Sequence, residues 1–326
     1  MRAVVQRLSS VVQLTRLTGA FAAVANVWFV VVWTRAFAEE LGTPEILDRP
    51  LWMPLAGSAT TALGLFAFGA TLNDVIDAKR DRTLRPDRPL ASEQVTIELA
   101  MGLAVGTLLL AVLGSLMLGQ QATILAVVVA VAITGYNVVG RFVPAVGLPL
   151  LSVVYAGHML VPNVHLVFTL PVLLVLAHSL VIGLVSHVLE GRVPRLSVRA
   201  VAFAIAGWAA CSALLVYSGP ARGSAGDLWP EWVPAMAWVW VVGSIAVLVF
   251  MCVRRIVRLK GGPRSAEKVR RYGTLWPAVY ACAWMVGAGK IAEAWPLLGL
   301  AIAGVLGMTI LREAYSLVEE PIEFKW

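Results

Sequence analysis

Charged residues are what this sequence has least of. They make up 14% of its 326 residues, whereas a soluble globular domain carries about a quarter. The chain is instead 59% hydrophobic, and its mean hydropathy is +0.82. This balance excludes an ordinary soluble domain and predicts a polytopic membrane protein.

Cysteine is also scarce. Cys211, Cys252 and Cys282 lie inside or at the ends of apolar runs, and they lack the spacing of metal ligands. We expect buried, unpaired thiols, not a metal site or a disulfide framework. No cleavable signal peptide is evident, because the basic N-terminal residues lead into a full-length apolar span.

Long apolar runs are abundant. Several reach the roughly 20 residues that cross a bilayer, and they are too long for the strands of a membrane barrel. We predict an all-α, polytopic membrane helical bundle of nine to ten transmembrane helices, forming a single domain over residues 1–326. The predicted helices lie at about 17–36, 51–73, 95–118, 121–138, 145–163, 167–188, 198–218, 233–257, 273–290 and 294–312.

Two of the predicted turns stay open. Only Gly289, Lys290 and their neighbours separate the last two helices, which form either a tight hairpin or one broken element. The break between the fifth and sixth helices lies either at Pro162-Asn163 or later, at Pro171.

Basic residues are distributed unevenly between the predicted loops. Ten spans place both termini on one side, and 22 of the 26 lysines and arginines fall on that side. The positive-inside rule makes that side cytoplasmic. We therefore predict an integral protein of the cytoplasmic (inner) membrane, with both termini and the active-site mouth in the cytoplasm. Nucleic acid is excluded as a partner because no soluble domain is left to bind it.

Acidic residues number only 19, yet three of them fall within eight positions after the second apolar run. On a helix, Asp74, Asp77 and Asp81 lie at i, i+3 and i+7, and Asn73 is one turn before Asp77. Such a stripe of oxygen ligands suits Mg²⁺, which takes further ligands from waters and substrate phosphates. The alternative is a solvated helix end, but carboxylates at a membrane boundary favour a function.

The segment Arg85-Pro86-Asp87-Arg88-Pro89 follows this stripe. Its prolines break the helix and hold Arg85 and Arg88 near the aspartates. Guanidinium groups match phosphate oxygens. The alternative interpretation is an ordinary basic loop on the cytoplasmic side.

A second polar group ends the helix predicted at 167–188. Ser186 and Glu190 are one turn apart, and Ser179 lies two turns before Ser186. The three side chains therefore share one helix face.

Glu190 is isolated from other acidic residues, which favours a function at the end of an apolar tract. The alternative is that Glu190 only pairs with Arg192 or Arg195 at the interface. His187 beside it is a ligand, a base or an interfacial polar residue, and the sequence leaves these alternatives open.

A third group closes the fourth predicted helix. Tyr136, Asn137 and Arg141 bring an aromatic ring, an amide and a guanidinium to the same mouth. Alone, the group indicates an interfacial anchor. Beside the other two groups, Arg141 becomes a candidate diphosphate contact.

Together these residues resemble the UbiA superfamily of intramembrane prenyltransferases. The pattern Asn73-x-x-x-Asp77-x-x-x-Asp81, with Asp74 inside it, is similar to that family's first aspartate-rich motif. Arg16, Asn26, the Arg-Pro-x-Arg-Pro-Leu segment and the residues from Tyr136 to Arg141 are also similar to it. The resemblance covers roughly residues 10–290, so the segment 294–326 resembles an added helix and a C-terminal tail.

The resemblance implies a mechanism. Asp74, Asp77 and Asp81, with Asn73 and Glu190, hold Mg²⁺ on the diphosphate of a prenyl donor, and basic residues neutralise the rest of the leaving group. The bond to oxygen ionises, and a small acceptor attacks the allylic cation within the membrane lipids. The implied diphosphate-binding residues are Arg16, Arg85, Arg88 and Arg141. The implied acceptor or prenyl pocket contains Asn26, Tyr136, Asn137, Ser179, Ser186 and His187.

The second aspartate-rich motif of that family is degenerate in this chain. Ser179 and Ser186 replace two of its aspartates, and a serine hydroxyl is a weak ligand for Mg²⁺. Three outcomes stay open: ordinary transfer with one or two Mg²⁺ ions; altered chemistry, such as cyclisation of the prenyl chain or transfer to a non-aromatic acceptor; or a protein that only binds or transports an isoprenoid lipid.

Overall fold

The computed structural model describes residues 14, 20–86, 88–219 and 228–319. These residues form ten α-helices and two short 3₁₀ segments, and no strand occurs among them. The α-helices are α2 (Ala20–Ala36), α3 (Trp52–Leu84), α4 (Ile97–Leu116), α5 (Gln120–Val138), α6 (Pro144–Leu160), α7 (Leu170–Glu190), α8 (Val198–Tyr217), α9 (Ala237–Arg258), α10 (Pro263–Gly287) and α11 (Ile291–Glu319). The 3₁₀ segments are η2 (Pro44–Ile46) and η3 (Gly140–Phe142).

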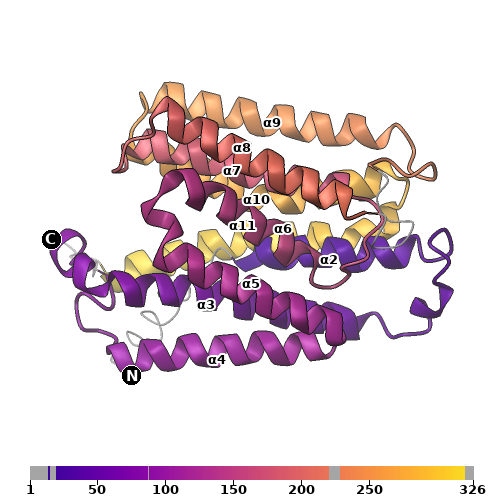
Figure 1. The fold of residues 1–326 in the computed structure, drawn as a ribbon, viewed down its shortest axis with the longest axis horizontal. Helices are drawn as coiled ribbons and strands as arrows, with labels where there is room; N and C mark the ends of the chain where they lie inside the picture. Colours follow the sequence, from indigo (N-terminus) through magenta and orange to yellow (C-terminus); the bar gives the residue numbers. More distant parts are fainter. Residues whose placement is uncertain (1–13, 15–19, 87, 220–227, 320–326) are drawn as a thin grey trace, which may run out of the picture.

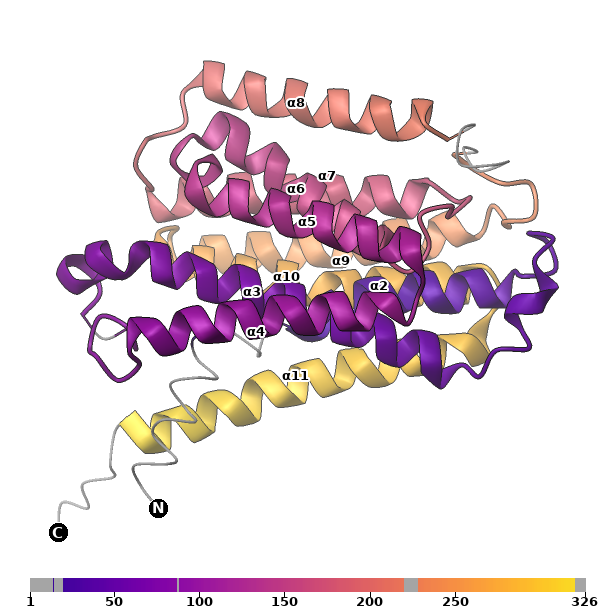
Figure 2. The same cartoon turned by 60° about the horizontal axis from the view of Figure 1, so that its bottom comes forward.

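Successive helices run in opposite directions along the long axis of the bundle, as Figure 1 and Figure 2 show. The ends of α3, α5, α7 and α9 meet the beginnings of α4, α6, α8 and α10 at one end, which we call the aspartate end. The loop 37–51, the turn between α6 and α7, and the turn between α10 and α11 lie at the opposite end. Loops that are far apart in the sequence therefore gather at the aspartate end.

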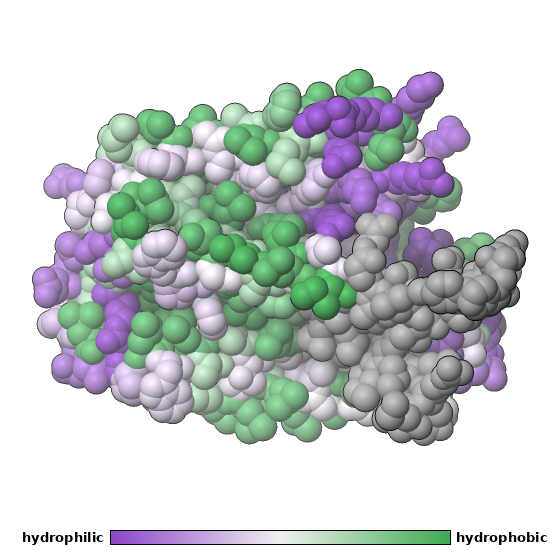
Figure 3. Space-filling view, turned by 180° about the vertical axis from the view of Figure 1, so that it is seen from behind, coloured by the Kyte–Doolittle hydropathy of each residue, from purple (hydrophilic) through white to green (hydrophobic). Residues whose placement is uncertain are grey.

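An apolar belt surrounds the middle of the bundle. Six helices are long and apolar enough to cross a membrane, namely α3, α4, α5 with η3, α7, α8 and α9. Shorter apolar helices are α2, α6 and residues Ile291–Gly307 of α11. In the space-filling view the hydrophobic surface lies between two polar ends (Figure 3). The prediction of an all-α membrane bundle is confirmed, and the count of nine to ten spans stays a prediction.

α8 and α4 show most clearly how these helices present apolar side chains to their surroundings. Among the described residues of α8, only Ala204 is buried, while Phe203 and Leu214 are exposed. On α4, Leu109 and Leu113 are likewise exposed. Large exposed apolar side chains on a helix are expected where lipid, not water, surrounds it.

The prediction that the second helix ends at residue 73 is wrong, because α3 continues to Leu84. Hydropathy falls where the aspartates begin, but the backbone stays helical. The helix ends where Arg85 leaves the helical conformation, directly before Pro86. The whole stripe from Asn73 to Asp81 therefore lies on one continuous helix.

The prediction that the ninth helix begins at residue 273 is also wrong, because α10 begins at Pro263. Proline suits the first turn of a helix, where its missing N–H costs nothing. The first turns of α10 are too basic to register as apolar. α10 and α11 are separate helices joined by a tight turn, in which Gly289 takes a φ of +77°. Pro171 lies in the first turn of α7 and does not interrupt it.

The three cysteines lie on α8, α9 and α10. They are unpaired, as predicted, but each is half-buried and not fully buried. Partial exposure of a thiol on an apolar helix face agrees with a lipid surrounding.

Candidate active site

The last turns of α3 carry four oxygen-bearing side chains on one stripe. The carboxylates of Asp74 and Asp81 are buried, with 8% of each side chain exposed. Asp77 lies between them and is 15% exposed. Asn73 donates from Nδ2 to Asp74 Oδ1 at 3.2 Å and contacts Asp77 Oδ2 at 3.5 Å. The amide therefore orients the first two carboxylates of the stripe.

Arg88 joins the two buried carboxylates. Its Nη1 lies 3.2 Å from Asp74 Oδ1 and 2.6 Å from Asp81 Oδ2. The loop after α3 places it there through backbone hydrogen bonds, from Arg88 N to Arg85 O and from Ser92 N to Arg88 O. Arg85 is exposed. The structure thus brings Arg88, and not Arg85, into contact with the aspartates.

Arg141 reaches the same stripe from η3, at the end of α5. Its Nη1 lies 2.7 Å from Asn73 Oδ1 and 2.7 Å from Asp77 Oδ2. Only 11% of the arginine side chain is exposed. Its Nε and Nη2 are buried and have no hydrogen-bond partner among the described residues. Buried donors without acceptors are costly, so this guanidinium is arranged to receive a further anionic group.

A close backbone contact positions η3. A Cβ atom added to Gly147, in the first turn of α6, would lie 2.2 Å from the carbonyl oxygen of Gly140. Only glycine permits this approach. The contact holds the segment that carries Arg141 against α6, and it therefore fixes where the guanidinium enters the site.

The aspartate end thus combines acceptors and donors in one cluster. Three carboxylates and an amide oxygen face two guanidinium groups, and each guanidinium uses a single Nη for its contacts with the stripe. A divalent cation suits the carboxylate oxygens, and a phosphate suits the remaining guanidinium donors. Within the described ranges, no three His, Cys, Asp or Glu side chains lie close enough together to hold a metal by themselves.

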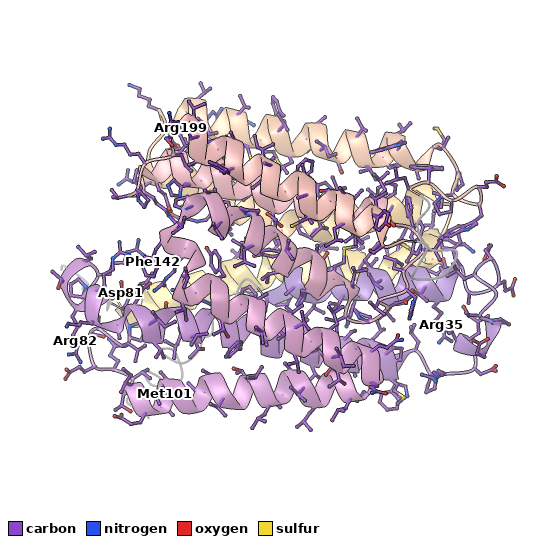
Figure 4. The ribbon with its side chains drawn as sticks, in the orientation of Figure 1. Arg35, Asp81, Arg82, Met101, Phe142 and Arg199 are labelled. Carbon is purple, nitrogen blue, oxygen red and sulfur yellow. The ribbon has the colours of Figure 1, made fainter. Side chains whose placement is uncertain are left out.

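α7 ends in a different set of contacts. Glu190 forms ion pairs with Arg270 of α10 and with Arg192. Figure 4 labels Arg199, just beyond the α7–α8 loop, at the same end of the bundle as Asp81. The structure therefore places Glu190 at the aspartate end but pairs it with arginines. Its contribution to the metal site stays a prediction.

Two other polar side chains of α7, those of Ser179 and His187, bond within or near their own helix. Ser179 Oγ donates to Val175 O at 2.9 Å, and His187 Nε2 lies 3.0 Å from Pro194 O. Ser186 Oγ is buried and has no hydrogen-bond partner in the described part of the chain. α7 therefore presents hydroxyl groups and an arginine-paired glutamate, not free carboxylates.

The remaining predicted residues are more dispersed. Asn26 donates from Nδ2 to Tyr155 O at 3.2 Å and lines a small apolar pocket with Met159 and Trp284. Asn137 is buried and donates to Gly69 O at 3.3 Å, which ties α5 to α3. Tyr136 is half-buried beside it. Arg16 lies outside the described residues.

Arg270 is the residue of this region that the sequence did not single out. It is one of eight lysines and arginines between residues 254 and 271. Their composition is typical of a basic loop, and nothing in their order indicates which of them forms an ion pair with Glu190. Its position became evident only because α10 extends through this segment.

Two comparisons with known proteins gave a match. The family model for the UbiA prenyltransferase family matches residues 26–191, just over half of the chain. A solved structure of a digeranylgeranylglyceryl phosphate synthase in membranes has a TM-score of 0.55 and 17% sequence identity, over 87% of this chain and 99% of that chain. At this identity the likeness shows a shared fold. Among curated proteins, none matches the chain.

Proposed function

Because the chain belongs to the UbiA prenyltransferase family, we propose that it uses Mg²⁺ to transfer an isoprenyl group from a prenyl diphosphate to a small acceptor within the membrane. The observation that carries this proposal is the pair of buried guanidinium donors of Arg141 that lack acceptors among the described residues. Diphosphate oxygens are the natural partners of such donors.

The donor set at the end of α3 fits Mg²⁺. Mg²⁺ prefers oxygen and usually takes only one or two carboxylates, completing its coordination with water and substrate phosphates. Asp77 and its neighbours Asn73 and Asp81 supply oxygens of this kind on one stripe. When bound, such an ion stabilises negative charge on the departing diphosphate.

The residues of the chain have separate roles in this proposal. Asp74, Asp77 and Asp81, with Asn73, would supply oxygen ligands for Mg²⁺, and substrate phosphates and water would complete the set. Arg141 and Arg88 bind phosphate oxygens while the bond between the prenyl carbon and oxygen breaks. Stabilisation of the negative charge on the leaving group is the main contribution to catalysis. Because Arg88 already bridges two carboxylates, it is positioned to share its remaining donors with the leaving group.

The polar residues of α7 have a supporting role in this proposal. Glu190 adds a carboxylate to the metal–diphosphate site if its ion pairs with Arg192 and Arg270 open, and the same event releases two guanidinium groups toward the leaving group. Ser179, Ser186 and His187, together with Asn26, Tyr136 and Asn137, are the candidates for contact with the acceptor or the prenyl chain. Arg16 and Arg85 are further proposed diphosphate contacts.

The charge distribution supports an orientation. Most lysines and arginines in the described part of the chain lie at the aspartate end, so the positive-inside rule favours the cytoplasm for that end, and we propose the same side for both termini. A donor then presents its diphosphate at the cytoplasmic face and its tail to the apolar belt.

Turnover of labelled prenyl diphosphates by the purified protein tests the proposal. The acceptor panel contains aromatic acids and a glyceryl phosphate lipid, since the solved neighbour is a synthase of a prenylated glyceryl phosphate. We expect Mg²⁺-dependent product formation that falls at least about 100-fold in Asp77→Asn, as loss of a transition-state charge contact predicts. Asp48→Asn, an exposed carboxylate at the opposite end, serves as the matched control. Undiminished turnover in Asp77→Asn would refute the assignment.

One observation favours a second candidate, a UbiA-type enzyme with altered chemistry. α7 offers serines and a single carboxylate, Glu190, where a second set of carboxylates would hold a second ion. Cyclisation of the prenyl chain, or transfer to a non-aromatic acceptor, would accommodate this difference. Product analysis without any acceptor separates cyclisation from transfer, because only cyclisation then yields a cyclic hydrocarbon or alcohol.

A protein that only binds or transports an isoprenoid lipid would bind the prenyl donor without breaking its bond to the diphosphate. Release of pyrophosphate on addition of a donor distinguishes the enzymes from this alternative. A binding protein would retain the donor intact and release none.

A further inference from the structure

A pocket of about 490 Å³ opens at the end of the bundle opposite the aspartates. The last turn of α2, the loop 37–51 and the first turns of α11 form its walls. Figure 4 labels Arg35, which lines this pocket, at the far end of the bundle from Asp81. The volume lies within the range of small-molecule sites, and the proposed prenyl transfer makes no use of it.

Three carboxylates line the pocket. Glu39 and Glu40 follow α2, and Glu293 lies in the first turn of α11. None of the three forms an ion pair or a side-chain hydrogen bond with another described residue. Three carboxylates that face one pocket repel each other, so a ligand with a positive charge stabilises them.

The two basic residues of the pocket are already engaged. Arg35 donates from Nη1 to Arg49 O at 2.6 Å and from Nη2 to Leu47 O at 3.0 Å, which anchors the loop. Lys290 Nζ lies 4.7 Å from the centre of the Phe37 ring. Neither cation forms an ion pair with Glu39, Glu40 or Glu293. Both nevertheless keep N–H groups for an anion, since a guanidinium has five and an ammonium has three.

The inner wall of the pocket is apolar and fixed. Val32, Leu51 and Pro296 line it. Phe37, next to the lining residue Lys290, packs against Trp33, with ring centres 4.6 Å apart. Clustered aromatic residues are typical of the membrane–water interface, which favours a position of the pocket at the depth of lipid headgroups.

We infer that this pocket binds the headgroup of an aminophospholipid from the leaflet opposite the aspartate end. The ammonium lies among Glu39, Glu40 and Glu293, and the phosphate receives N–H groups of Lys290 and Arg35. The glycerol and the first acyl carbons contact the apolar wall. A purely anionic lipid leaves the carboxylates uncompensated, and a soluble amine leaves the apolar wall uncovered.

Calorimetric titration of the delipidated, full-length protein in detergent tests this site. The ligands are dioctanoyl phosphatidylethanolamine, dioctanoyl phosphatidylglycerol and free phosphoethanolamine. We expect phosphatidylethanolamine to bind about tenfold more tightly than either of the others, and Glu293→Gln to weaken its binding about tenfold, as loss of one charged hydrogen bond predicts. Glu45→Gln, an exposed residue of the same loop that does not line the pocket, is expected to bind like the wild type.

Equal affinity for phosphatidylethanolamine and phosphatidylglycerol would overturn the inference, as would unchanged binding by Glu293→Gln. Free phosphoethanolamine that binds as tightly as the lipid would overturn the assignment to a membrane lipid. Glu39→Gln is a second variant, and because Glu39 is exposed, its substitution leaves folding intact. None of these measurements depends on prenyl transfer.

Discussion

Arg141 has an arrangement of donors that a lysine at this position could not reproduce. One Nη bridges Asn73 and Asp77, and the remaining donors stay buried without an acceptor among the described residues. The planar guanidinium separates these donors in fixed directions, whereas an ammonium concentrates its charge at one point. The residue therefore links the carboxylate stripe to the proposed diphosphate position.

Arg141→Lys is expected to lower kcat/KM for the prenyl diphosphate by about 10- to 100-fold, which corresponds to the loss of one or two charged hydrogen bonds. Steady-state assay of pyrophosphate release measures this ratio. Arg82→Lys is the matched control, because Arg82 is 63% exposed and its nearest carboxylate, on Glu93, is 3.7 Å away. Equal kcat/KM for Arg141→Lys and the wild type would show that the guanidinium does not contact the donor.

At the scale of elements, the packing of η3 against α6 determines the position of Arg141. Gly147 allows the carbonyl of Gly140 to approach the first turn of α6. The same segment carries Arg141. A change in helix packing at this point is therefore expected to reach the carboxylate stripe through the backbone.

Gly147→Ala is expected to destabilise the protein by about 1–3 kcal/mol, since its new methyl group overlaps the Gly140 carbonyl. Because η3 must shift, turnover should also fall by about tenfold or more, as the loss of a charged contact predicts. Gly135→Ala is the control on the neighbouring helix, where a Cβ would meet nothing within 4 Å. Thermal unfolding in detergent and the turnover assay measure both effects. A stable, fully active Gly147→Ala would contradict this view of the junction.

α7 and α10 are joined by a second backbone feature. Pro277 has no N–H, so the carbonyl of Gly273 one turn earlier lacks its usual helical donor. His178 of α7 supplies the missing hydrogen bond from Nε2 at 2.8 Å, and Nδ1 lies 3.2 Å from the hydroxyl of Tyr280. Because a carbonyl only accepts, the proton lies on Nε2, and Nδ1 accepts from the tyrosine.

His178→Phe is expected to cost about 1–3 kcal/mol, because it leaves the buried Gly273 carbonyl without a donor. In a Pro277→Ala background the cost should be smaller, since an alanine at this position restores the helical N–H. A double-mutant cycle on unfolding free energies in detergent measures the difference. Additive costs would show that the histidine does not replace the missing donor.

At the scale of the whole molecule, the distribution of basic residues supports the proposed orientation in the membrane. We expect Glu93→Cys, in the loop between α3 and α4, to react with a membrane-impermeant maleimide only after cells are opened. Asp48→Cys, in the loop between α2 and α3, should react in intact cells. The positive-inside rule supplies the physical reason. Labelling of Glu93→Cys in intact cells would reverse the proposed topology.

The sequence predicted the parts of this molecule that depend on local patterns. The apolar runs indicated the helical bundle, and the spacing of Asp74, Asp77 and Asp81 indicated the stripe on α3. Hydropathy could not locate the ends of α3 or α10, since charged helical turns and charged loops have the same composition. These ends were decided by Pro86 and Pro263.

Contacts between distant segments were beyond the sequence alone. The ion pair of Glu190 with Arg270 joins residues 80 positions apart, and the approach of Gly147 to Gly140 depends on how α6 packs. Asn137 was a candidate for the pocket, but its contact with Gly69 O also gives it a place in helix packing. The pocket at the opposite end arises from three segments that no shared motif connects.

The central claim is that the α3 carboxylates and Arg141 together bind a divalent ion and a prenyl diphosphate. Its most direct test is the affinity for a non-reactive prenyl thiolodiphosphate, measured with and without Mg²⁺ in the wild type and in Asp77→Asn. We predict that Mg²⁺ tightens binding by at least about tenfold in the wild type, and that Asp77→Asn loses most of this gain, as removal of a carboxylate ligand requires. Affinity that is the same with and without Mg²⁺, in both proteins, would contradict the account.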